Sequence, residues 1–279
     1  MHNRPKMKKF EGILICTDLD GTLLRDDKSI SKENLDAIEY FKSEGGYFTI
    51  ITGRMPYFAS DIYSVVKPNA PFGCINGGGL FDAVNDKYVW TKTLPSEVLE
   101  LVEYADNNIE ELGIQLNTFD KIYFTRNNEA MEMFRQQTGT PNIPGSYKGF
   151  DIPIAKVVFG DVSDEKLNRL ADLLNAHPKA DRFDFIRSAD ILYEILPKNT
   201  NKGAILPILA EYLGIEMRKV VAIGDYNNDV EMIRTAGVGV AVANAAPEAK
   251  AVADVVTVSN EEHAIAKVIY DIESGSIRV

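Results

Sequence analysis

Short apolar runs, each closed by a polar or glycine-containing turn, occur near both ends of the chain. Short apolar runs of this kind are typical of buried strands in a parallel sheet. Segments with apolar residues at helical spacing lie between them; Ser31 is placed to cap the first, and Gly45-Gly46 closes it. This alternation predicts a parallel sheet with helices on both faces. The expected strands are 13–16, 47–51, 72–76, 220–225, 237–242 and 255–258. The expected helices include 202–213 and a helix through Arg234 that Asn227-Asn228-Asp229 caps.

The middle of the chain has a different pattern, in which pairs of strand-like segments occur among helical ones. Such a mixture predicts an α+β module built on an antiparallel sheet. We therefore expect an inserted α+β domain at residues 88–196 and a Rossmann-like α/β core formed by residues 1–87 and 197–279. The paired segments are 113–117 with 121–125 and 182–187 with 191–195, and the Pro/Gly-rich stretch 139–153 is expected to be a long loop.

Composition narrows the class of protein. The 279 residues are 45% hydrophobic and 25% charged, as in ordinary globular proteins. A formal net charge of −11 disfavours nucleic acid as a partner, because phosphate backbones attract Lys and Arg. No apolar run approaches the roughly 18 residues of a membrane span, and no secretory segment follows the basic, irregular start at residues 1–9. We expect a cytoplasmic protein, monomeric or weakly homo-oligomeric, that has no membrane partner and keeps Cys16 and Cys74 as buried thiols.

Two carboxylates, Asp18 and Asp20, end the first apolar run, and Gly21 and Thr22 follow at once. Burying a carboxylate costs free energy unless a cation or hydrogen bonds compensate it. Side chains two residues apart share one face of a plain strand, so this pair suits one metal ion and one reacting phosphorus. A solvated acidic turn after a strand explains the same residues equally well. The pair alone leaves both interpretations open.

Polar residues at the other strand ends favour the metal site. The carboxyl ends of parallel strands meet at one edge of a sheet, where such folds bind ligands. Oxygen-rich side chains of this kind suit Mg²⁺, which binds through one or two carboxylates together with a substrate phosphate. The absence of a His or Cys cluster in the sequence argues against zinc. The residues expected at this edge are Asp18, Asp20, Thr52, Lys202, Asp225, Asn228 and Asp229.

Four segments of the chain together resemble the motifs of the haloacid dehalogenase (HAD) superfamily. Their order, and the long insertion between the second and third, resemble the Cof-type (class IIB) phosphatases of that superfamily. The resemblance extends from residue 13 to about residue 269. The segments are Asp18-Leu19-Asp20-Gly21-Thr22, Thr52-Gly53-Arg54, Lys202-Gly203 and Gly224-Asp225-Tyr226-Asn227-Asn228-Asp229.

The resemblance implies a catalytic role for four residues. Asp18 matches the nucleophile that forms an aspartyl-phosphate. Asp20 matches the general acid and base that protonates the leaving alcohol and then activates water. Thr52 matches the hydroxyl that binds the transferring phosphoryl group, and Lys202 matches the lysine that offsets negative charge.

The resemblance also implies metal and phosphate ligands. Asp225 matches the principal Mg²⁺ ligand, beside Asp18 and the backbone carbonyl of Asp20, and Asp229 joins this metal group. Asp229 and Asn228 match positions that orient the metal's waters, the lysine or the phosphate. Gly77 either helps to cradle phosphate or only lets the chain turn into a hairpin. The residues expected near the substrate are Gly53, Arg54, Asn76, Gly77 and Asn228.

These assignments lead us to expect a Mg²⁺-dependent phosphatase of small phosphomonoesters, sugar phosphates above all, with the inserted domain as a cap that selects the substrate. Two other functions use the same aspartates. A phosphomutase or phosphotransferase of similar fold would return the phosphate to a sugar. A non-enzymatic signalling module would hold a long-lived phosphoaspartate; Asp20 and the large insertion argue against it.

Overall fold

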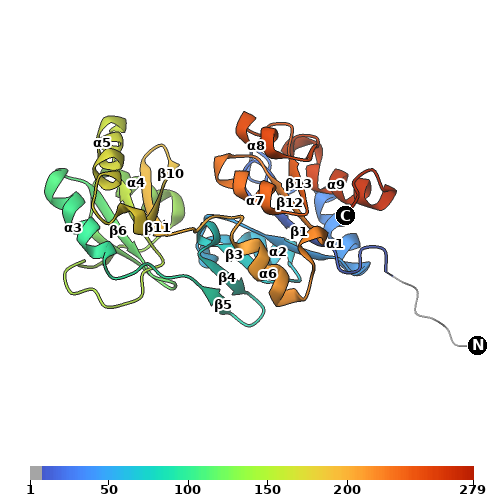
Figure 1. Ribbon diagram of the computed structural model, residues 1–279, viewed down its shortest axis with the longest axis horizontal. Coiled ribbons are helices and arrows are strands. Elements are labelled where there is room, and N and C mark those ends of the chain that lie inside the picture. The colour runs from blue at the N-terminus through green and yellow to red at the C-terminus, as the bar shows by residue number, and fades with distance from the viewer. Residues whose placement is uncertain (1–7) are drawn as a thin grey trace, which may run out of the picture. The chain divides into compact units, whose positions relative to one another are not determined.

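The computed structural model describes residues 8–279, which form two compact units (Figure 1). One contains the described chain up to Thr91 together with Asn201–Val279, and the other is Lys92–Thr200. The boundaries expected from the sequence, 87/88 and 196/197, lie four residues earlier at each junction. At the first junction the difference arises because β5 (Lys87–Thr91) pairs with β4 (Gly79–Asp82) inside the first unit. Most of the basic N-terminal stretch, residues 1–7, lies outside the described residues.

The first unit is built on a five-stranded sheet in the order β14-β13-β12-β1-β2. Every neighbouring pair is parallel, and β1 places Cys16 opposite Ala222 on one side and Thr49 on the other. This confirms the predicted α/β class. The strands are β1 (Leu14–Thr17), β2 (Tyr47–Ile50), β12 (Val220–Gly224), β13 (Val238–Ala241) and β14 (Val255–Val256).

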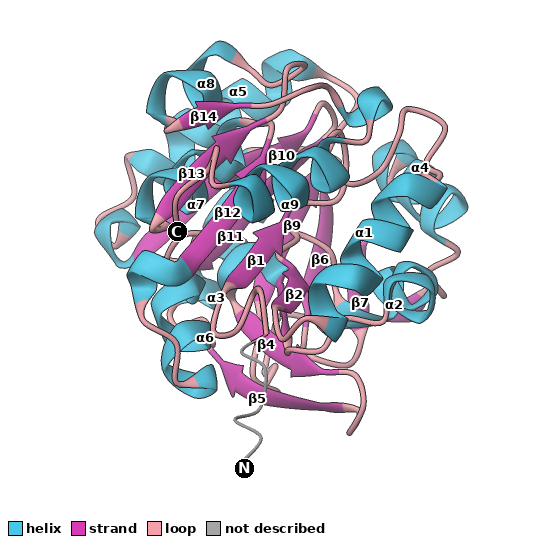
Figure 2. Cartoon of the chain, turned by 90° about the vertical axis from the view of Figure 1, so that its right-hand side faces the viewer, coloured by secondary structure: helices cyan, strands magenta, loops and turns pink. Residues whose placement is uncertain are grey.

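Helices lie on both sides of this sheet, with α6 and α7 on one side and α1 on the other (Figure 2). Leu206 and Met232 pack with Cys16 of β1 in a buried apolar cluster. The hydroxyl of Ser31 accepts the N–H of Asn34 at 3.2 Å and caps α1, as predicted. The helices are α1 (Lys32–Ser43), α2 (Ser60–Val66), α6 (Ile205–Leu213), α7 (Val230–Thr235), α8 (Pro247–Val252) and α9 (Ala264–Ser274).

Helix α6 begins at Ile205, three residues later than the sequence predicted. Helix α7 begins at Val230, directly after the Asn227–Asp229 segment that was expected to cap it. A turn precedes α6, where the N–H of Ala204 donates to the carbonyl of Asn201 at 3.1 Å. A 3₁₀ turn, Asn227–Asp229, precedes α7. Lys202 and Asp229 therefore lie in turns and not in regular helices.

A small antiparallel sheet, β3-β4-β5, continues the first unit beyond β2. Ile51 bridges in parallel to Gly73 and links β3 (Phe72–Cys74) to the end of β2. The strand expected at 72–76 ends two residues early, because Ile75 and Asn76 adopt φ values of 55° and 51° in a 3₁₀ turn. The expected hairpin then forms from β4 and β5.

The second unit has a six-stranded sheet in the order β10-β11-β9-β6-β7-β8, antiparallel except for β7 with β8. The predicted loop 139–153 contains the short strand β8. The hydroxyl of Tyr147 in this loop donates to Oδ2 of Asp106 in α3 at 2.8 Å. The elements are α3 (Val98–Asn108), β6 (Gly113–Asn117), β7 (Ile122–Arg126), α4 (Glu129–Thr138), β8 (Ile143–Pro144), β9 (Lys156–Gly160), α5 (Asp164–Asn175), β10 (Phe183–Ala189) and β11 (Leu192–Pro197).

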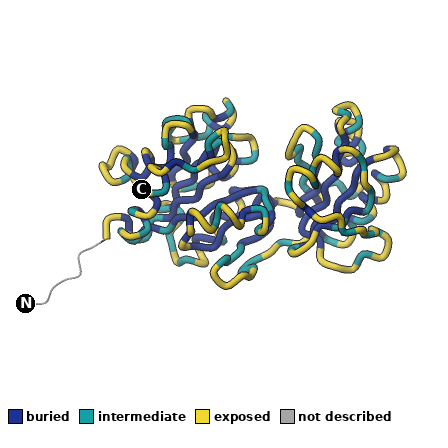
Figure 3. Tube along the Cα trace, turned by 180° about the vertical axis from the view of Figure 1, so that it is seen from behind, coloured by how far each residue is buried: buried dark blue, intermediate teal, exposed yellow. Residues whose placement is uncertain are grey.

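Each unit has its own buried interior, with buried strands and exposed loops (Figure 3). In the second unit Leu101 of α3 and Leu170 of α5 pack with Val157 of β9. Cys16 and Cys74 are both buried, as expected for cysteines in apolar runs. Among the described residues, the helices are all too short or too polar to cross a membrane.

Candidate active site

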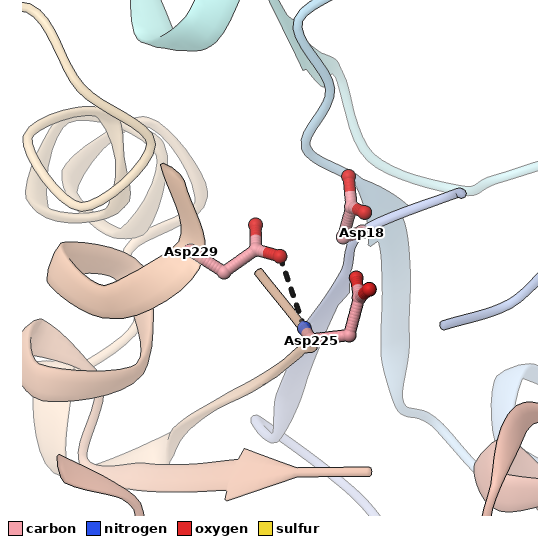
Figure 4. Close-up of side chains that lie close together, drawn as sticks. All are labelled: Asp18, Asp225 and Asp229. Carbon is pink, nitrogen blue, oxygen red and sulfur yellow. Dashed lines mark hydrogen bonds between the residues drawn. The ribbon is translucent and has the colours of Figure 1, made fainter. Parts of the chain in front are cut away.

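Three carboxylates meet at the carboxyl edge of the parallel sheet. Asp18 directly follows β1, Asp225 directly follows the neighbouring β12, and Asp229 ends the 3₁₀ turn after it. The N–H of Asp18 donates to the carbonyl of Ile223 at 2.9 Å, which extends the pairing of β1 with β12 up to the site. One oxygen from each carboxylate lies within 4.8 Å of the others. Figure 4 shows the carboxylates of Asp18 and Asp225 side by side, with Asp229 facing them.

Lys202 is buried between two of these carboxylates. Its Nζ donates to Oδ1 of Asp18 and to Oδ1 of Asp229, each at 2.6 Å, and only 1% of the residue is exposed. The next residue, Gly203, lies against α7, where an added Cβ would come within 2.3 Å of the carbonyl oxygen of Glu231. A side chain at 203 would therefore separate the turn that carries Lys202 from α7.

Asp229 organises the site through its second oxygen. Oδ2 accepts the N–H groups of Asp225 at 3.0 Å and Tyr226 at 3.1 Å (Figure 4 shows the first of these bonds). Gly224 makes room for it, because a Cβ at that position would lie 2.5 Å from the Cβ of Asp229. Both oxygens of Asp229 thus have strong donors. This contact set matches the orienting role expected for Asp229 more closely than that of a metal ligand.

Asp225 is held by the turn that follows Asp18. The hydroxyl of Thr22 donates to Oδ1 of Asp225 at 2.9 Å. Gly21 adopts a φ of +79°, and a Cβ there would approach Oδ2 of Asp225 to 2.5 Å. Sequence reasoning did not assign a role to Thr22. Its place directly behind Asp18-Leu19-Asp20-Gly21 was the only signal in the sequence, because its partner lies 203 residues further along the chain.

The group carries excess negative charge. Burial and the charge of Asp229 raise the pKa of Asp18 to about 8, although Lys202 opposes the shift. The same two causes raise the pKa of Asp225 to about 6, against the hydrogen bond from Thr22. Burial alone would lower the pKa of Lys202, but Asp18 and Asp229 raise it instead. One ammonium group therefore faces three carboxylates, and an all-oxygen donor set with this surplus charge fits a divalent cation such as Mg²⁺.

Asp20 contacts a different set of residues. Its carboxylate accepts from the Nη2 of Arg54 at 2.9 and 2.8 Å and from the Nζ of Lys28 at 3.0 Å. Partial burial would raise the pKa of Asp20, but the charge of Arg54 and hydrogen bonds from Lys28 and Arg54 outweigh it, and the pKa lies below its usual value. Asp18 and Asp20 are thus separated in environment, because the regular strand ends at Thr17 and Gly21 turns the chain. The sequence did not point to Lys28.

The residues expected near a substrate form a second group in the first unit. Thr52 is buried and its Oγ1 accepts the N–H of Arg54 at 3.2 Å. The side chain of Asn228 donates to Oδ1 of Asn76 at 3.4 Å. Gly53 lies against the same Asn76 oxygen, which would be 2.8 Å from an added Cβ. The structure thus brings together residues that the sequence placed in separate turns.

Gly77 has a structural reason to be glycine. Its φ is +94°, and an added Cβ would lie 2.2 Å from the carbonyl oxygen of Asn201. The start of the hairpin therefore packs directly on the turn that presents Lys202. This close approach explains Gly77 without any contact to phosphate.

Comparison with known proteins agrees with this geometry. The model of a family described as haloacid dehalogenase-like hydrolases matches residues 15–269. A putative phosphatase of Bacillus subtilis, YxeH, is 33% identical and the match covers 93% of this chain and 97% of that protein. The 5-amino-6-(5-phospho-D-ribitylamino)uracil phosphatase YitU of the same organism is 29% identical, with 91% and 95% covered. The crystal structure of a haloacid dehalogenase-like hydrolase from Bacteroides thetaiotaomicron superimposes with a TM-score of 0.83 at 25% identity, over 94% of this chain and 100% of that one.

Proposed function

The chain belongs to the haloacid dehalogenase-like hydrolases and is a phosphatase of that family, and from that premise we propose that it is a Mg²⁺-dependent enzyme. Its substrates are small phosphomonoesters, sugar phosphates above all, which it hydrolyses through an aspartyl-phosphate on Asp18. The observation that carries this proposal is the buried Lys202, which holds Asp18 and Asp229 at 2.6 Å beside Asp225. The contact with Lys202 fixes one oxygen of this strand-end carboxylate, which supports the assignment of Asp18 as the nucleophile.

The first step transfers the phosphoryl group to the protein. An Asp18 oxygen forms a bond to phosphorus while the bond from phosphorus to the leaving oxygen breaks, and Asp20 supplies the proton that this oxygen takes up. Thr52, buried at the end of the β2 segment, is assigned to bind the phosphoryl oxygens. Because Asp20 pairs with Arg54 and Lys28 in this structure, it must leave these partners to carry that proton.

The second step releases phosphate. Water attacks the phosphorus of the aspartyl-phosphate, the bond to the Asp18 oxygen breaks, and Asp20, now ionised, accepts the proton of the water. This returns Asp18 and Asp20 to their starting states. Arg54 favours the ionised state of Asp20, and Asp20 must be ionised to accept this proton.

Charge is the main obstacle to the reaction. At 4 Å and an effective dielectric constant of about 20, each pair of like unit charges costs on the order of 4 kcal/mol. Lys202 offsets part of the repulsion between a dianionic phosphate and the carboxylates. Asp18 and Asp225 are the side chains that would hold Mg²⁺, which supplies the remaining positive charge when bound.

The substrate class rests on the relatives. YitU is named for a phosphorylated ribityl compound, so a small, polyhydroxylated phosphomonoester is the substrate class that we assign to this chain. We assign selection of the leaving group to the second unit, the role that cap domains have in similar proteins.

Replacing Asp18 tests the mechanism. Asp18→Asn is expected to abolish release of phosphate from p-nitrophenyl phosphate and from a panel of sugar phosphates in the presence of Mg²⁺, while the protein stays folded. Asp161→Asn is the matched control, because Asp161 is a buried carboxylate in the second unit with its own lysine partner, Lys166 at 3.3 Å. Activity retained by Asp18→Asn would exclude Asp18 as the nucleophile.

Labelled water separates hydrolysis from the other functions that use these aspartates. We expect phosphate released in H₂¹⁸O to carry the solvent oxygen. Phosphate transferred to a second sugar without solvent oxygen would indicate a mutase or phosphotransferase. A stable phosphoaspartate without turnover would indicate a signalling module.

A further inference from the structure

Asn260, a buried residue near the C-terminus, binds the chain that follows Asp20. Its Nδ2 donates to the backbone carbonyl of Leu24 at 3.1 Å and to Oδ1 of Asp26 at 3.2 Å. The neighbouring Glu261 accepts the N–H of Asp26 at 2.8 Å. Two consecutive residues thus hold a segment that lies more than 230 positions earlier in the sequence.

A second amide, that of Asn244, extends this contact toward the site. The N–H of Asn260 donates to Oδ1 of Asn244 at 3.0 Å, and Nδ2 of Asn244 donates to the carbonyl of Gly21 at 2.8 Å. Because Asn260 occupies the oxygen of Asn244, the amide nitrogen of Asn244 faces Gly21. The same turn also reaches the neighbouring strand end, since the N–H of Ala246 donates to the carbonyl of Asp225 at 2.7 Å.

The segment held in this way lies directly on Asp225. The hydroxyl of Thr22 donates to one oxygen of the Asp225 carboxylate, and Gly21 lies against the other. Asp20 precedes these two residues in the chain. A change in the position of this segment therefore changes the environment of Asp225 and the position of Asp20 together.

Asn260 is itself fixed by the turn that begins with it. Asn260–Glu262 is a 3₁₀ turn in which the carboxylate of Glu262 accepts from the N–H and the hydroxyl of Ser259 at 3.2 and 2.7 Å, while Glu262 donates its own N–H to the Ser259 carbonyl at 2.9 Å. This reciprocal capping orders the backbone on which Asn260 stands. Only 3% of Asn260 is exposed.

We propose that Asn260, acting with Asn244, is a positioning residue of the candidate active site. It holds the segment from Gly21 to Asp26 against Asp225, which sets the Asp225 carboxylate for a divalent cation and Asp20 for proton transfer. Its effect on turnover rests on the proposed phosphatase function, whereas its effect on cation binding does not.

Asn260→Ala tests this role against Asn34→Ala. Asn34 is the matched control, because it is also a buried asparagine that bonds the backbone of a distant segment, accepting the N–H of Ala266 at 3.0 Å. We expect Asn260→Ala to raise the Kd for Mn²⁺, titrated without substrate and followed by electron paramagnetic resonance, about ten-fold. We expect kcat to fall by a similar factor, with KM nearly unchanged. Asn34→Ala should leave the Mn²⁺ Kd and kcat within about two-fold of the wild type, even where both variants lose thermal stability.

The outcomes are distinct. An unchanged Mn²⁺ Kd in Asn260→Ala, or an equal rise in Asn34→Ala, overturns the positioning role. If Asn260→Ala does not fold, Asn244→Ala replaces it. Asn244 is exposed, and loss of its side chain removes the contact with Gly21 and the acceptor for the N–H of Asn260. We expect the same rise in the Mn²⁺ Kd for Asn244→Ala. A wild type that binds Mn²⁺ but releases no phosphate from any substrate refutes the proposed function, while the Kd comparison still decides the role of Asn260.

Discussion

Lys202 shows what a single residue contributes to this site. A buried ion pair adds little net stability compared with apolar packing, but loss of one partner leaves an uncompensated charge in the interior. Lys202 has two such partners, Asp18 and Asp229, and all three are buried. The lysine therefore supports both the fold around the site and the proposed chemistry.

Removal of this ammonium group should be costly. Lys202→Met is expected to abolish turnover and to lower the free energy of unfolding by about 3–5 kcal/mol, measured by urea denaturation without metal. Lys179→Met is the control, because Lys179 makes an equally short 2.6 Å pair with Glu100, but on the surface, where loss of the pair changes stability little. Equal destabilisation by the two substitutions would contradict the importance of burial.

The raised carboxylate pKa values predict how stability depends on pH. A folded-state pKa above the unfolded value means that the folded protein binds more protons, so stability falls as pH rises through the folded pKa. Both carboxylates have an ordinary pKa of 3.8 in the unfolded chain. Asp225 therefore lowers stability as the pH rises from there to about 6, and Asp18 lowers it as the pH rises to about 8. In EDTA, the free energy of unfolding should decrease between about pH 6 and pH 8.

Two changes should remove that decrease. Asp18→Asn eliminates the group that titrates in the upper part of the range, and saturating Mg²⁺ favours the ionised carboxylates. Urea denaturation at pH 6, 7 and 8 measures each effect. A decrease of the same size in Asp18→Asn would show that another group causes it.

The sequence identified some of these residues and missed others for a physical reason. Asp18, Lys202, Asp225 and Asp229 could be predicted to converge, because the carboxyl ends of parallel strands meet at one edge. Thr22 acts through a hydrogen bond to a partner 203 residues away, and the Asn260 side chain through hydrogen bonds to partners 236 and 234 residues away. No local spacing or motif reveals such a contact.

At the scale of elements, the turns after the strands determine the site more than the strands do. The order of strands and helices could be predicted from apolar periodicity, and the antiparallel second sheet from its hairpin pairs. The end of β3 could not, because Ile75 and Asn76 adopt positive φ values while their N–H groups donate to the carbonyls of Arg54 and Thr52, more than 20 residues earlier. The orientation of Asp20 is of the same kind, since it depends on the φ of +79° at Gly21.

Gly21 and Gly139 form a matched pair for testing this view. Both have positive φ, at +79° and +68°, so an alanine at either position adds a backbone cost of roughly 1 kcal/mol. An alanine at 21 would also meet Oδ2 of Asp225 at 2.5 Å, whereas no described atom lies within 4 Å of a Cβ built at 139. Gly21→Ala should therefore weaken Mn²⁺ binding, and Gly139→Ala should leave the Kd unchanged.

The measurement is a Mn²⁺ titration on both variants, accompanied by thermal unfolding. Comparable Kd values for Gly21→Ala and the wild type would show that the close approach of Gly21 to Asp225 does not set the cation site.

At the scale of the whole molecule, all of the candidate site residues belong to the first unit, although the second lies between them in the sequence. The second unit has its own apolar core and its own sheet. Replacement of residues 92–200 by a short Gly/Ser linker should therefore leave Mn²⁺ binding within a few-fold of the wild type. The ability to distinguish one phosphomonoester from another should be lost, which a comparison of kcat/KM across a substrate panel would measure.

Retained discrimination in the shortened chain would contradict the role that we assign to the second unit. Loss of Mn²⁺ binding with an otherwise folded core would show that the first unit does not build the cation site alone.

The position of β1 between β12 and β2 has a consequence for biosynthesis. One neighbour, β2, follows it closely along the chain, but the other, β12, is made only at Val220–Gly224. During synthesis from the N-terminus, the buried strand β1 therefore keeps one unpaired edge while the entire second unit emerges. A nascent chain that ends before residue 220 should consequently be a target for chaperones, and it lacks Asp225 and Asp229 of the carboxylate cluster.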